Sequence, residues 1–399
     1  MLPAGGTVRI DLFKMERTQC MYENEVDYNL SESGVLPMRV EEILDGADPS
    51  TFLSLGLKYT ESDGSKEFRD HIANWYGTTR DHILVTNGGS EANLMCAWSL
   101  LEKDGHAAVM VPNYLQTWGL ARAYAGKANS FRLMEKVENG KPRWGLDVDS
   151  FHKAVSKKTR LIVVTNPNNP TGAVLNEEEM EEILRVARKA NAWLMVDEIY
   201  RGAEVSAPLT PTFWDRYDKL LITSGLSKAF GAPGLRIGWV AGPRKMIAKL
   251  CSYHDYTTLT PTMLGDRLGR IIMEPSRREK VLERTRAIIR RNLPKLESWI
   301  HSHDDIFTYI PPVAGAITFF RYKLPISSSA LFDRLRKEQS VLITPGDHFG
   351  FGRYIRVGYG YDIDYTLRGL ARVDITLEEL KRKGSRAKPV RAVARRGAA

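Results

Sequence analysis

The chain has 399 residues, of which 43% are hydrophobic and 26% charged, so it fits a large domain with a second, smaller one and excludes a disordered or fibrous protein. The net charge is +9, but eight of the basic residues lie in 381–399, and the rest of the chain is nearly neutral. No run of about 18 apolar residues could span a membrane and the N-terminus lacks the pattern of a signal peptide, so a cytoplasmic location is expected.

The first 45 residues are expected to form an arm. A helical stretch precedes the loop YNLSESGVLP at 28–37. We expect both to pack against the C-terminal part of the chain.

Residues 46–285 are expected to form a large α/β domain. Short apolar runs alternate with amphipathic helical stretches, which is typical of a parallel sheet covered on both faces. A helix is predicted from Asn176, because Glu179 completes a capping box there and an apolar stripe follows. The expected strands are 82–86, 107–111, 160–165, 192–198, 219–224 and 236–242.

Residues 286–380 are expected to form the smaller domain. A long charged helix at 277–300 leads to strands near 317–322 and 354–360. The basic segment 381–399 is expected to be a disordered, solvated tail, because it lacks interleaved aromatic residues. The three cysteines are scattered and odd in number, so neither a disulfide framework nor a metal site is expected: Cys20, Cys96 and Cys251.

Polar residues follow the ends of the expected strands, where open α/β sheets bind their ligands. VTNGGSEANL runs through a Gly-rich turn into a helix, so the backbone N–H groups of Gly89, Ser90 and Glu91 could bind a phosphate. A turn with a purely structural role is the alternative. VTNPNNPTG places the amide of Asn169 after a buried strand, within reach of a ligand oxygen.

Two further segments put charged side chains in apolar surroundings. MVDEIY ends an apolar strand at Asp197, and a buried carboxylate needs a partner such as a pyridinium nitrogen. Tyr200, three residues later, could reach an adjacent phenolic oxygen. SGLSKAFGAPGLRIGW places Lys228 in a tight turn and Arg236 eight residues on, and a lysine in such a position is a candidate to form a Schiff base.

In their order and spacing, these four segments resemble the class I/II aminotransferases of fold type I, which use pyridoxal 5′-phosphate (PLP). The resemblance spans about residues 25 to 375. It implies an α/β fold with a mostly parallel seven-stranded sheet between helices and a smaller α+β domain. It also implies that Lys228 holds PLP as a Schiff base and moves the proton at the substrate Cα. Asp197 would pair with the pyridine nitrogen, and Asn169 and Tyr200 would bind the phenolic oxygen.

The resemblance also implies which residues would contact the phosphate, the ring face and the substrate. Three residues would hold the phosphate: Gly89, Ser90 and Arg236. Tyr114 would stack on the ring, and Arg356 matches the arginine that binds the substrate α-carboxylate through a bidentate pair. Tyr59 matches a tyrosine that reaches the phosphate of the partner subunit. A homodimer with shared active sites is therefore implied.

Two features depart from the family pattern. Three residues before Lys228, where the family often has a phosphate-binding Ser, this chain has Gly225, and Ser224 or Ser227 could substitute for it. The loop 28–37 also places Glu32 and Ser33 where the substrate side chain would lie. Within that loop, LSESGV resembles the corresponding loop of capreomycidine synthase-like PLP enzymes, which cyclise an arginine derivative.

An acidic residue also occupies a second position linked to substrate choice. Asp255 falls near the place where aspartate-specific relatives carry an arginine. We expect Glu32 and Asp255, the latter from its own or the partner chain, to favour a substrate with a cationic or polar side chain. Two solvated acids without this role are the alternative.

The leading hypothesis is an aminotransferase that interconverts an amino acid and a 2-oxo acid. A PLP-dependent cyclase, elimination or replacement enzyme, or oxidase stays open, because Lys228 and Asp197 serve all these reactions equally. A DNA-binding module on the same scaffold is not expected, because the resemblance begins near residue 25 and leaves no room for a helix-turn-helix. The expected partners are small molecules and a second copy of the chain, not a membrane or a nucleic acid.

Overall fold

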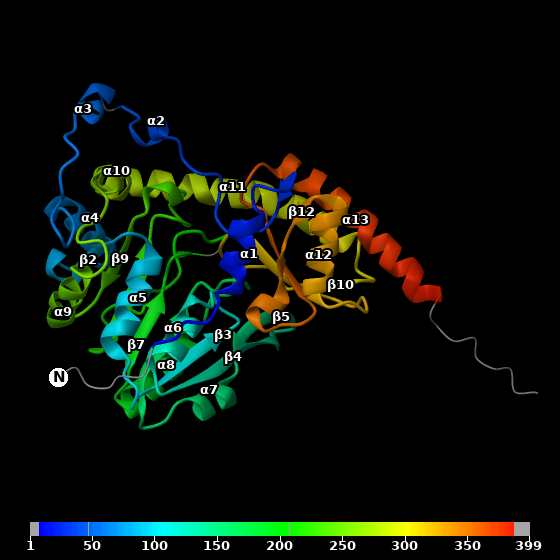
Figure 1. The fold of residues 1–399 in the computed structure, drawn as a ribbon, viewed down its shortest axis with the longest axis horizontal. Coiled ribbons are helices and arrows are strands. Elements are labelled where there is room, and N and C mark those ends of the chain that lie inside the picture. The colour runs from blue at the N-terminus through cyan, green and yellow to red at the C-terminus, as the bar shows by residue number, and fades with distance from the viewer. Residues whose placement is uncertain (1–7, 47, 207, 387–399) are drawn as a thin grey trace, which may run out of the picture.

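The computed structural model describes residues 8–46, 48–206 and 208–386, which form two layered units and an N-terminal arm (Figure 1). The larger unit is built on an eight-stranded sheet and the smaller one on a four-stranded sheet. The long helix α11 (Pro275–His301) runs from the larger unit to the smaller one. It confirms the helix expected at 277–300.

The large sheet is mostly parallel, as predicted, but it has eight strands where seven were predicted, because a surface hairpin adds a strand at one edge. All five strands from β8 to β4 pair in parallel, whereas β9 and β5 pair antiparallel with their neighbours. All six expected strands belong to it. In the order in which they lie side by side, the strands are β2 (Ile83–Thr86), β9 (Gly238–Ala241), β8 (Leu220–Gly225), β7 (Trp193–Asp197), β6 (Thr159–Thr165), β3 (His106–Val111), β4 (Lys127–Glu138) and β5 (Lys141–Leu146).

Both faces of this sheet are buried. Along β6, Leu161 and Val163 join one apolar cluster, while Ile162 and Val164 join another on the opposite face. Because successive side chains of a strand point to opposite faces, both faces need apolar residues, which gives the continuous hydrophobic runs seen in the sequence.

Helices cover the two faces and connect the strands. Helix α8 begins with the predicted capping box, in which the Glu179 N–H donates to the Asn176 side chain (2.9 Å) and the Asn176 N–H donates to the Glu179 carboxylate (3.1 Å). The helices of the larger unit are α4 (Lys66–Tyr76), α5 (Gly89–Leu100), α6 (Gln116–Tyr124), α7 (Val148–Ala154), α8 (Glu177–Ala190), α9 (Arg244–His254) and α10 (Met263–Met273), with short 3-10 segments at Arg80–His82 and Pro233–Leu235.

The hairpin of β4 and β5 was not among the expected strands. Most β4 residues are exposed or half-buried, so the strand lacks the apolar run of a central strand. Its turn carries a signal that could have located it, because Asn139 and Gly140 both have positive φ (51° and 73°) and Asn-Gly is the preferred pair for a two-residue hairpin turn.

The smaller unit is an antiparallel sheet packed against helices. Its strands follow the order β10 (Phe307–Thr308), β11 (Ile317–Tyr322), β14 (Tyr354–Gly358) and β13 (Thr344–Pro345), and they include the two expected ones. Helices α12 (Ser328–Gln339) and α13 (Ile363–Arg386) complete it, with a 3-10 turn at Gly346–Phe349. The helix α13 extends beyond residue 380, so the first residues of the expected tail are helical, and 387–399 lie outside the described residues.

The N-terminal arm joins the two units. Strand β1 (Tyr28–Asn29) pairs in parallel with β12 (Val341–Leu342) of the smaller unit. Helix α1 (Lys14–Tyr22) lies across the junction between the units, whereas α3 (Pro49–Leu53) stands away from the body (Figure 1). The short helix α2 (Val40–Ile43) packs on α11, where Arg277 donates to the Ile43 carbonyl (3.0 Å). The domain boundaries given above stay a prediction. No helix in the described part of the chain is long and apolar enough to cross a bilayer.

Candidate active site

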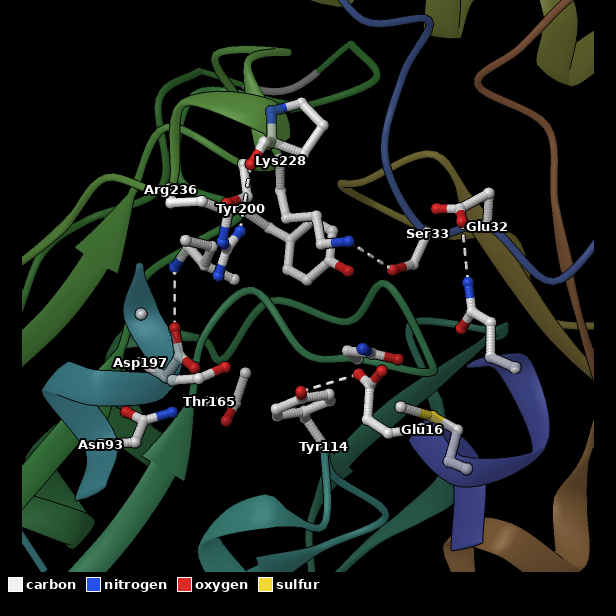
Figure 2. A pocket seen from close by; sticks show the side chains of 18 of the residues that line it. Glu16, Glu32, Ser33, Asn93, Tyr114, Thr165, Asp197, Tyr200, Lys228 and Arg236 are labelled. Atoms are coloured by element: carbon white, nitrogen blue, oxygen red, sulfur yellow. Dashed lines mark hydrogen bonds between the residues drawn. The ribbon is translucent and has the colours of Figure 1, made fainter. Parts of the chain in front are cut away.

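A cavity of about 810 Å³ opens beneath α1, beside the C-terminal ends of β6, β7 and β8 (Figure 2). This is the edge of the sheet where open α/β folds bind ligands. The structure brings eleven of the expected site residues to its walls: Glu32, Ser33, Gly89, Ser90, Tyr114, Asn169, Asp197, Tyr200, Ser227, Lys228 and Arg236.

One end of the cavity has the features of an anion site. Helix α5 begins at Gly89, so the free N–H groups of its first turn face the cavity together with Ser90. Arg236 supplies a positive charge there and donates to the Pro233 carbonyl (3.0 Å). Gly88 has a φ of 85°, and a Cβ on it would lie 2.4 Å from Arg236 Nη2, so only glycine lets this guanidinium approach the helix end.

Asp197 lies at the end of β7, deep in the cavity. Its Oδ1 accepts the Ile199 N–H (3.0 Å), and the Asn93 amide lies beside it. Burial raises the pKa of Asp197 to about 6, although both hydrogen bonds oppose the shift. A cation placed against this carboxylate would restore its ionised form.

Two polar side chains near Asp197 face the centre of the cavity. The Tyr200 side chain is buried, and its hydroxyl makes no hydrogen bond of normal geometry among the described residues, although the Ser33 hydroxyl is near. Burial raises the pKa of Tyr200 to about 12. Asn169, 4% exposed, accepts a hydrogen bond from Arg356 (2.9 Å). An unpaired buried hydroxyl points to a ligand oxygen as its missing partner.

Lys228 is the only lysine on the cavity wall within the described residues. Its Nζ donates to the Ser33 hydroxyl (2.8 Å), and burial lowers its pKa, with the positive charge of Arg356 acting in the same direction. Figure 2 shows its amine between Asp197 and Arg236 on one side and Ser33 and Glu32 on the other. A lysine with a lowered pKa has more of its neutral, nucleophilic form at neutral pH.

Arg356 lies in β14 and is 1% exposed. Its Nη1 donates to Asn169, and its Nη2 donates to the Ser31 carbonyl (2.6 Å) and the Thr344 hydroxyl (3.1 Å). Its Nε has no hydrogen-bond partner among the described residues. The side chain therefore presents a buried positive charge behind Asn169, with no carboxylate paired to it within the described chain.

Helix α1 and Glu23, the residue that follows it, supply wall residues that the sequence analysis did not identify; those of the helix are Met15, Glu16, Gln19 and Cys20. The Tyr114 hydroxyl donates to Glu16 (2.7 Å), and Gln19 donates to Glu32 (2.8 Å). The Phe13 ring packs edge-on against Tyr114. The order KMERTQCMYE has charged and polar residues on all sides of the helix, so the sequence alone gave no reason to prefer a buried face.

Four expected residues do not line this cavity, and one of them, Arg356, lies behind Asn169 as described above. The Glu91 carboxylate points away from it, accepting hydrogen bonds from the Asn87 N–H (2.6 Å) and the Thr258 hydroxyl (2.7 Å). Tyr59 is 80% exposed, and Asp255 is exposed at the end of α9. A role for Tyr59 or Asp255 in a site therefore requires a second copy of the chain.

The chain was compared with known families and curated proteins. The family model for aminotransferase class I and II matches residues 29–373. Capreomycidine synthase from Streptomyces vinaceus is 28% identical over 291 residues, covering 73% of each chain. An aspartate aminotransferase from Streptomyces avermitilis is 26% identical, covering 81% of this chain and 82% of that protein.

Solved structures resemble it over almost its whole length. A PLP-dependent aminotransferase from Streptococcus suis 89-1591 has a TM-score of 0.85 at 27% identity, covering 93% of this chain and 99% of the other. The PLP-dependent cyclase OrfR has a TM-score of 0.82 at 24% identity, covering 94% and 99%. At that identity, the likeness to OrfR concerns the fold alone.

The cavity fits PLP on its own chemistry. It combines an anion site at a helix start, a buried carboxylate for a pyridinium nitrogen, an unpaired phenol and a lysine with a lowered pKa. The cofactor is therefore PLP, and the chain is a PLP-dependent transferase of fold type I. With the family model matched from residue 29 to residue 373, the chain belongs to the class I and II aminotransferase family.

Proposed function

We propose that this protein is an aminotransferase that exchanges the α-amino group of an amino acid with a 2-oxo acid. The observation that carries the proposal is that Lys228 and Asp197 line one cavity and that the buried Arg356 lies directly behind its wall, donating to Asn169. An amine, an acid for the ring nitrogen and a buried cation for a carboxylate are what a PLP enzyme acting on amino acids requires.

We assign the cofactor contacts as follows. Asp197 binds the pyridine nitrogen, and Tyr200 and Asn169 bind the phenolic oxygen. Tyr114 supports the ring, and PLP, when bound, supplies an electron sink for the carbanion at Cα. Four residues hold the phosphate: Gly89, Ser90, Ser227 and Arg236. The unpaired Tyr200 hydroxyl and the free N–H groups of α5 support this orientation.

Lys228 acts twice in the proposed reaction. Its Nζ would hold the cofactor covalently, and once the substrate amine has taken that place, the freed amine would be positioned to take the proton from Cα. A base needs to be neutral, and the burial of Lys228 favours that form. Ser33, which accepts a hydrogen bond from Nζ, holds the amine toward the substrate side of the cavity.

Arg356 binds the substrate α-carboxylate in this proposal. Its guanidinium is held by Asn169, the Ser31 carbonyl and Thr344, which fixes the orientation that a bidentate pair requires. The pair would bring Cα to the Lys228 side of the cavity. Burial of Arg356 strengthens its pair with the substrate carboxylate, because a buried guanidinium without a partner costs free energy.

The test is a substrate screen followed by absorbance. The cofactor-loaded protein is mixed with single amino acids, and conversion to the pyridoxamine form is recorded. We expect at least one amino acid to give this conversion and a 2-oxo acid to reverse it. A Lys228→Ala protein should lose the visible absorbance band and nearly all turnover. If turnover of an amino acid occurs without any pyridoxamine form, transamination is excluded.

A second candidate is a PLP-dependent cyclase, elimination or replacement enzyme, or oxidase. Similarity to capreomycidine synthase supports this second candidate, because that protein is 28% identical to this chain over 73% of the length of each. Product analysis separates the candidates: a cyclised, unsaturated or oxidised product with no 2-oxo acid partner would support the second one.

We also propose that the protein works as a homodimer. The segment that contains α3 exposes Leu53, Leu57 and Tyr59, each at least 80% accessible, and Tyr256 is 81% accessible. Figure 1 shows α3 away from the body. Large apolar side chains gathered on a projecting segment mark an interface with another chain.

A further inference from the structure

We propose that the active site selects an amino acid whose side chain carries a positive charge, and that Glu16, Glu23 and Glu32 are the residues that select it. This inference rests on the proposed function, since it concerns the substrate of that same cavity. It replaces Asp255 with Glu16 of α1 and Glu23, which follows that helix, and the sequence singled out neither.

The first argument is the placement of Glu32 between two groups that would hold the substrate. Arg356 donates to the carbonyl of Ser31, the residue before Glu32 (2.6 Å), and Lys228 donates to the hydroxyl of Ser33, the residue after it (2.8 Å). A substrate held by its carboxylate and its amine would therefore pass directly beside the Glu32 side chain.

The backbone at Glu32 is fixed. The Gly358 N–H donates to the Leu30 carbonyl (2.8 Å), and a Cβ on Gly358 would lie 1.8 Å from the Glu32 carbonyl oxygen. The loop thus packs onto β14, the strand that carries Arg356, with no space between them. Glu32 and Arg356 are consequently held at a constant separation, which is what a specificity residue requires.

The second argument is the position of two further carboxylates, Glu16 in α1 and Glu23 just after it. Glu16 and Glu23 line the same cavity, and Glu16 accepts a hydrogen bond from the Tyr114 hydroxyl. Burial and the negative charges of Glu32 and Glu16 raise the pKa of Glu23, so the three carboxylates lie close enough to repel one another. Figure 2 shows Glu16 and Glu32 on the opposite side of the Lys228 amine from Asp197 and Arg236.

The third argument is the charge balance of the cavity. In the proposed function, Arg236 binds the phosphate, Arg356 binds the substrate carboxylate and Lys228 is bonded to the cofactor. Within the described residues, no Lys, Arg or His forms an ion pair with Glu16, Glu23 or Glu32. Three half-buried carboxylates therefore lack a counter-charge once cofactor and carboxylate are in place, and partly buried charges need one.

A cationic substrate side chain supplies that charge. The same cavity contains the buried, unpaired hydroxyl of Tyr200, which independently marks it as a ligand site. A guanidinium or an ammonium group can bind carboxylates through charge-assisted hydrogen bonds, whereas the carboxylate of a dicarboxylic amino acid would be repelled.

The test compares substrates that differ only in charge. Binding of L-arginine and L-citrulline, and of L-lysine and L-norleucine, is measured by calorimetry on the cofactor-loaded protein at pH 8. We expect each cationic member to bind at least about tenfold more tightly than its neutral counterpart, since hydrogen bonds to charged groups are worth that much. L-Glutamate should bind more weakly than L-citrulline.

Variants assign the effect to residues. The charge-removing substitutions Glu16→Gln, Glu23→Gln and Glu32→Gln should each reduce the ratio of arginine affinity to citrulline affinity, because only arginine loses a charged partner. Glu178→Gln, an exposed acid in the first turn of α8, is the matched control and should leave the preference intact. Far-UV circular dichroism checks that each variant is folded.

Each outcome decides one point. Equal binding of arginine and citrulline, or tighter binding of glutamate, overturns the inference. A preference that persists in all three variants overturns the assignment to these residues. If the preference is present but no amino acid yields the pyridoxamine form, the inference stands and the proposed transamination fails.

Discussion

Asp197 shows how a buried carboxylate burdens the fold that carries it. It lies at the end of β7 with no cationic side chain paired to it among the described residues, and burial raises its pKa to about 6 from an ordinary value of 3.8. Without the cofactor, the ionised carboxylate destabilises the folded state. With the cofactor, the pyridinium would pair with it and remove that penalty.

The first prediction is that Asp197→Asn stabilises the cofactor-free protein. A folded-state pKa above the unfolded one means that the folded protein binds more protons between about pH 4 and pH 6, so stability falls as pH rises through that window. At pH 8 the variant should be more stable by up to about 3 kcal/mol, and near pH 4 the difference should vanish.

Thermal unfolding of both cofactor-free proteins at the two pH values measures this. The exposed Asp218→Asn protein serves as a control and should unfold like the parent at both. An equal Tm for Asp197→Asn and the parent at pH 8 would show that Ile199 and Asn93 already compensate the buried charge. Adding cofactor should reverse the order, because only the parent can then pair the ring nitrogen.

At the residue scale, the sequence could predict which chemical groups meet, but not all of them. Asp197, Lys228 and Asn169 were found because each interrupts an apolar or Gly-rich pattern next to a strand end. Glu16 and Glu23 were missed, because an acid on a polar helix looks the same whether it faces solvent or a cavity. Only the path of the chain places α1 over the site.

At the scale of the element, the start of α5 joins backbone geometry to ligand binding. Gly88 adopts a φ of 85° and leaves the space that Arg236 Nη2 occupies, so the turn and the guanidinium depend on each other. Arg236 itself has a positive φ of 53°, which is uncommon for a residue with a side chain. Such conformations persist where the surroundings impose them, often at binding sites.

The second prediction concerns Gly88→Ala. The new Cβ would displace Arg236 from the helix start, and alanine tolerates the positive φ poorly. We expect the affinity for PLP to fall at least about tenfold, since a lost hydrogen bond to a charged group costs roughly 1.5–3 kcal/mol. Affinity for pyridoxal, which lacks the phosphate, should change much less.

Absorbance titration of the cofactor-free protein measures both affinities. Gly119→Ala in α6 is the control, because a Cβ there meets no atom within 4 Å and the substitution should leave both affinities unchanged. A parallel loss for PLP and pyridoxal would mean that the turn supports the whole site and not the phosphate alone.

Strands that are buried along their length could be predicted from the sequence. Strands that are partly buried and partly exposed could not. The strands β6, β7 and β8 are buried along almost their whole length, so their apolar runs stand out in the sequence. The strand β4 runs from the sheet onto the surface, where it meets β5 and the smaller unit through Tyr354, whose hydroxyl donates to Glu135 (2.6 Å). Its polar side chains follow from that exposure.

At the scale of the whole molecule, a single chain leaves apolar surface exposed on a projecting segment. The segment around α3 projects from the body, and the residues of α3 have no buried side chain. Leu53, Leu57 and Tyr59 are therefore expected to be covered by a second copy. The sequence pointed to a dimer only through the resemblance of Tyr59, because surface leucines carry no positional signal of their own.

The third prediction is that Tyr59 serves the active site of the partner chain. In a dimer of that kind, Lys228→Ala subunits and Tyr59→Phe subunits complement each other. The mixed dimer contains one site with an intact Lys228 from the Tyr59→Phe chain and an intact Tyr59 from the other. That site should bind PLP with the affinity of the unsubstituted protein. The two variant homodimers are both impaired, Lys228→Ala in turnover and Tyr59→Phe in phosphate binding.

The experiment mixes the two variants after reversible dissociation and measures turnover at a PLP concentration that leaves the Tyr59→Phe homodimer mostly unloaded. Light scattering first establishes whether the particle has about twice the 45.1 kDa mass of the chain. Turnover above the sum of the separate homodimers supports a shared site. If Tyr59 acted within its own chain, every site in the mixture would carry one of the two defects, and mixing would give no gain, because no subunit would then hold both side chains at one cofactor.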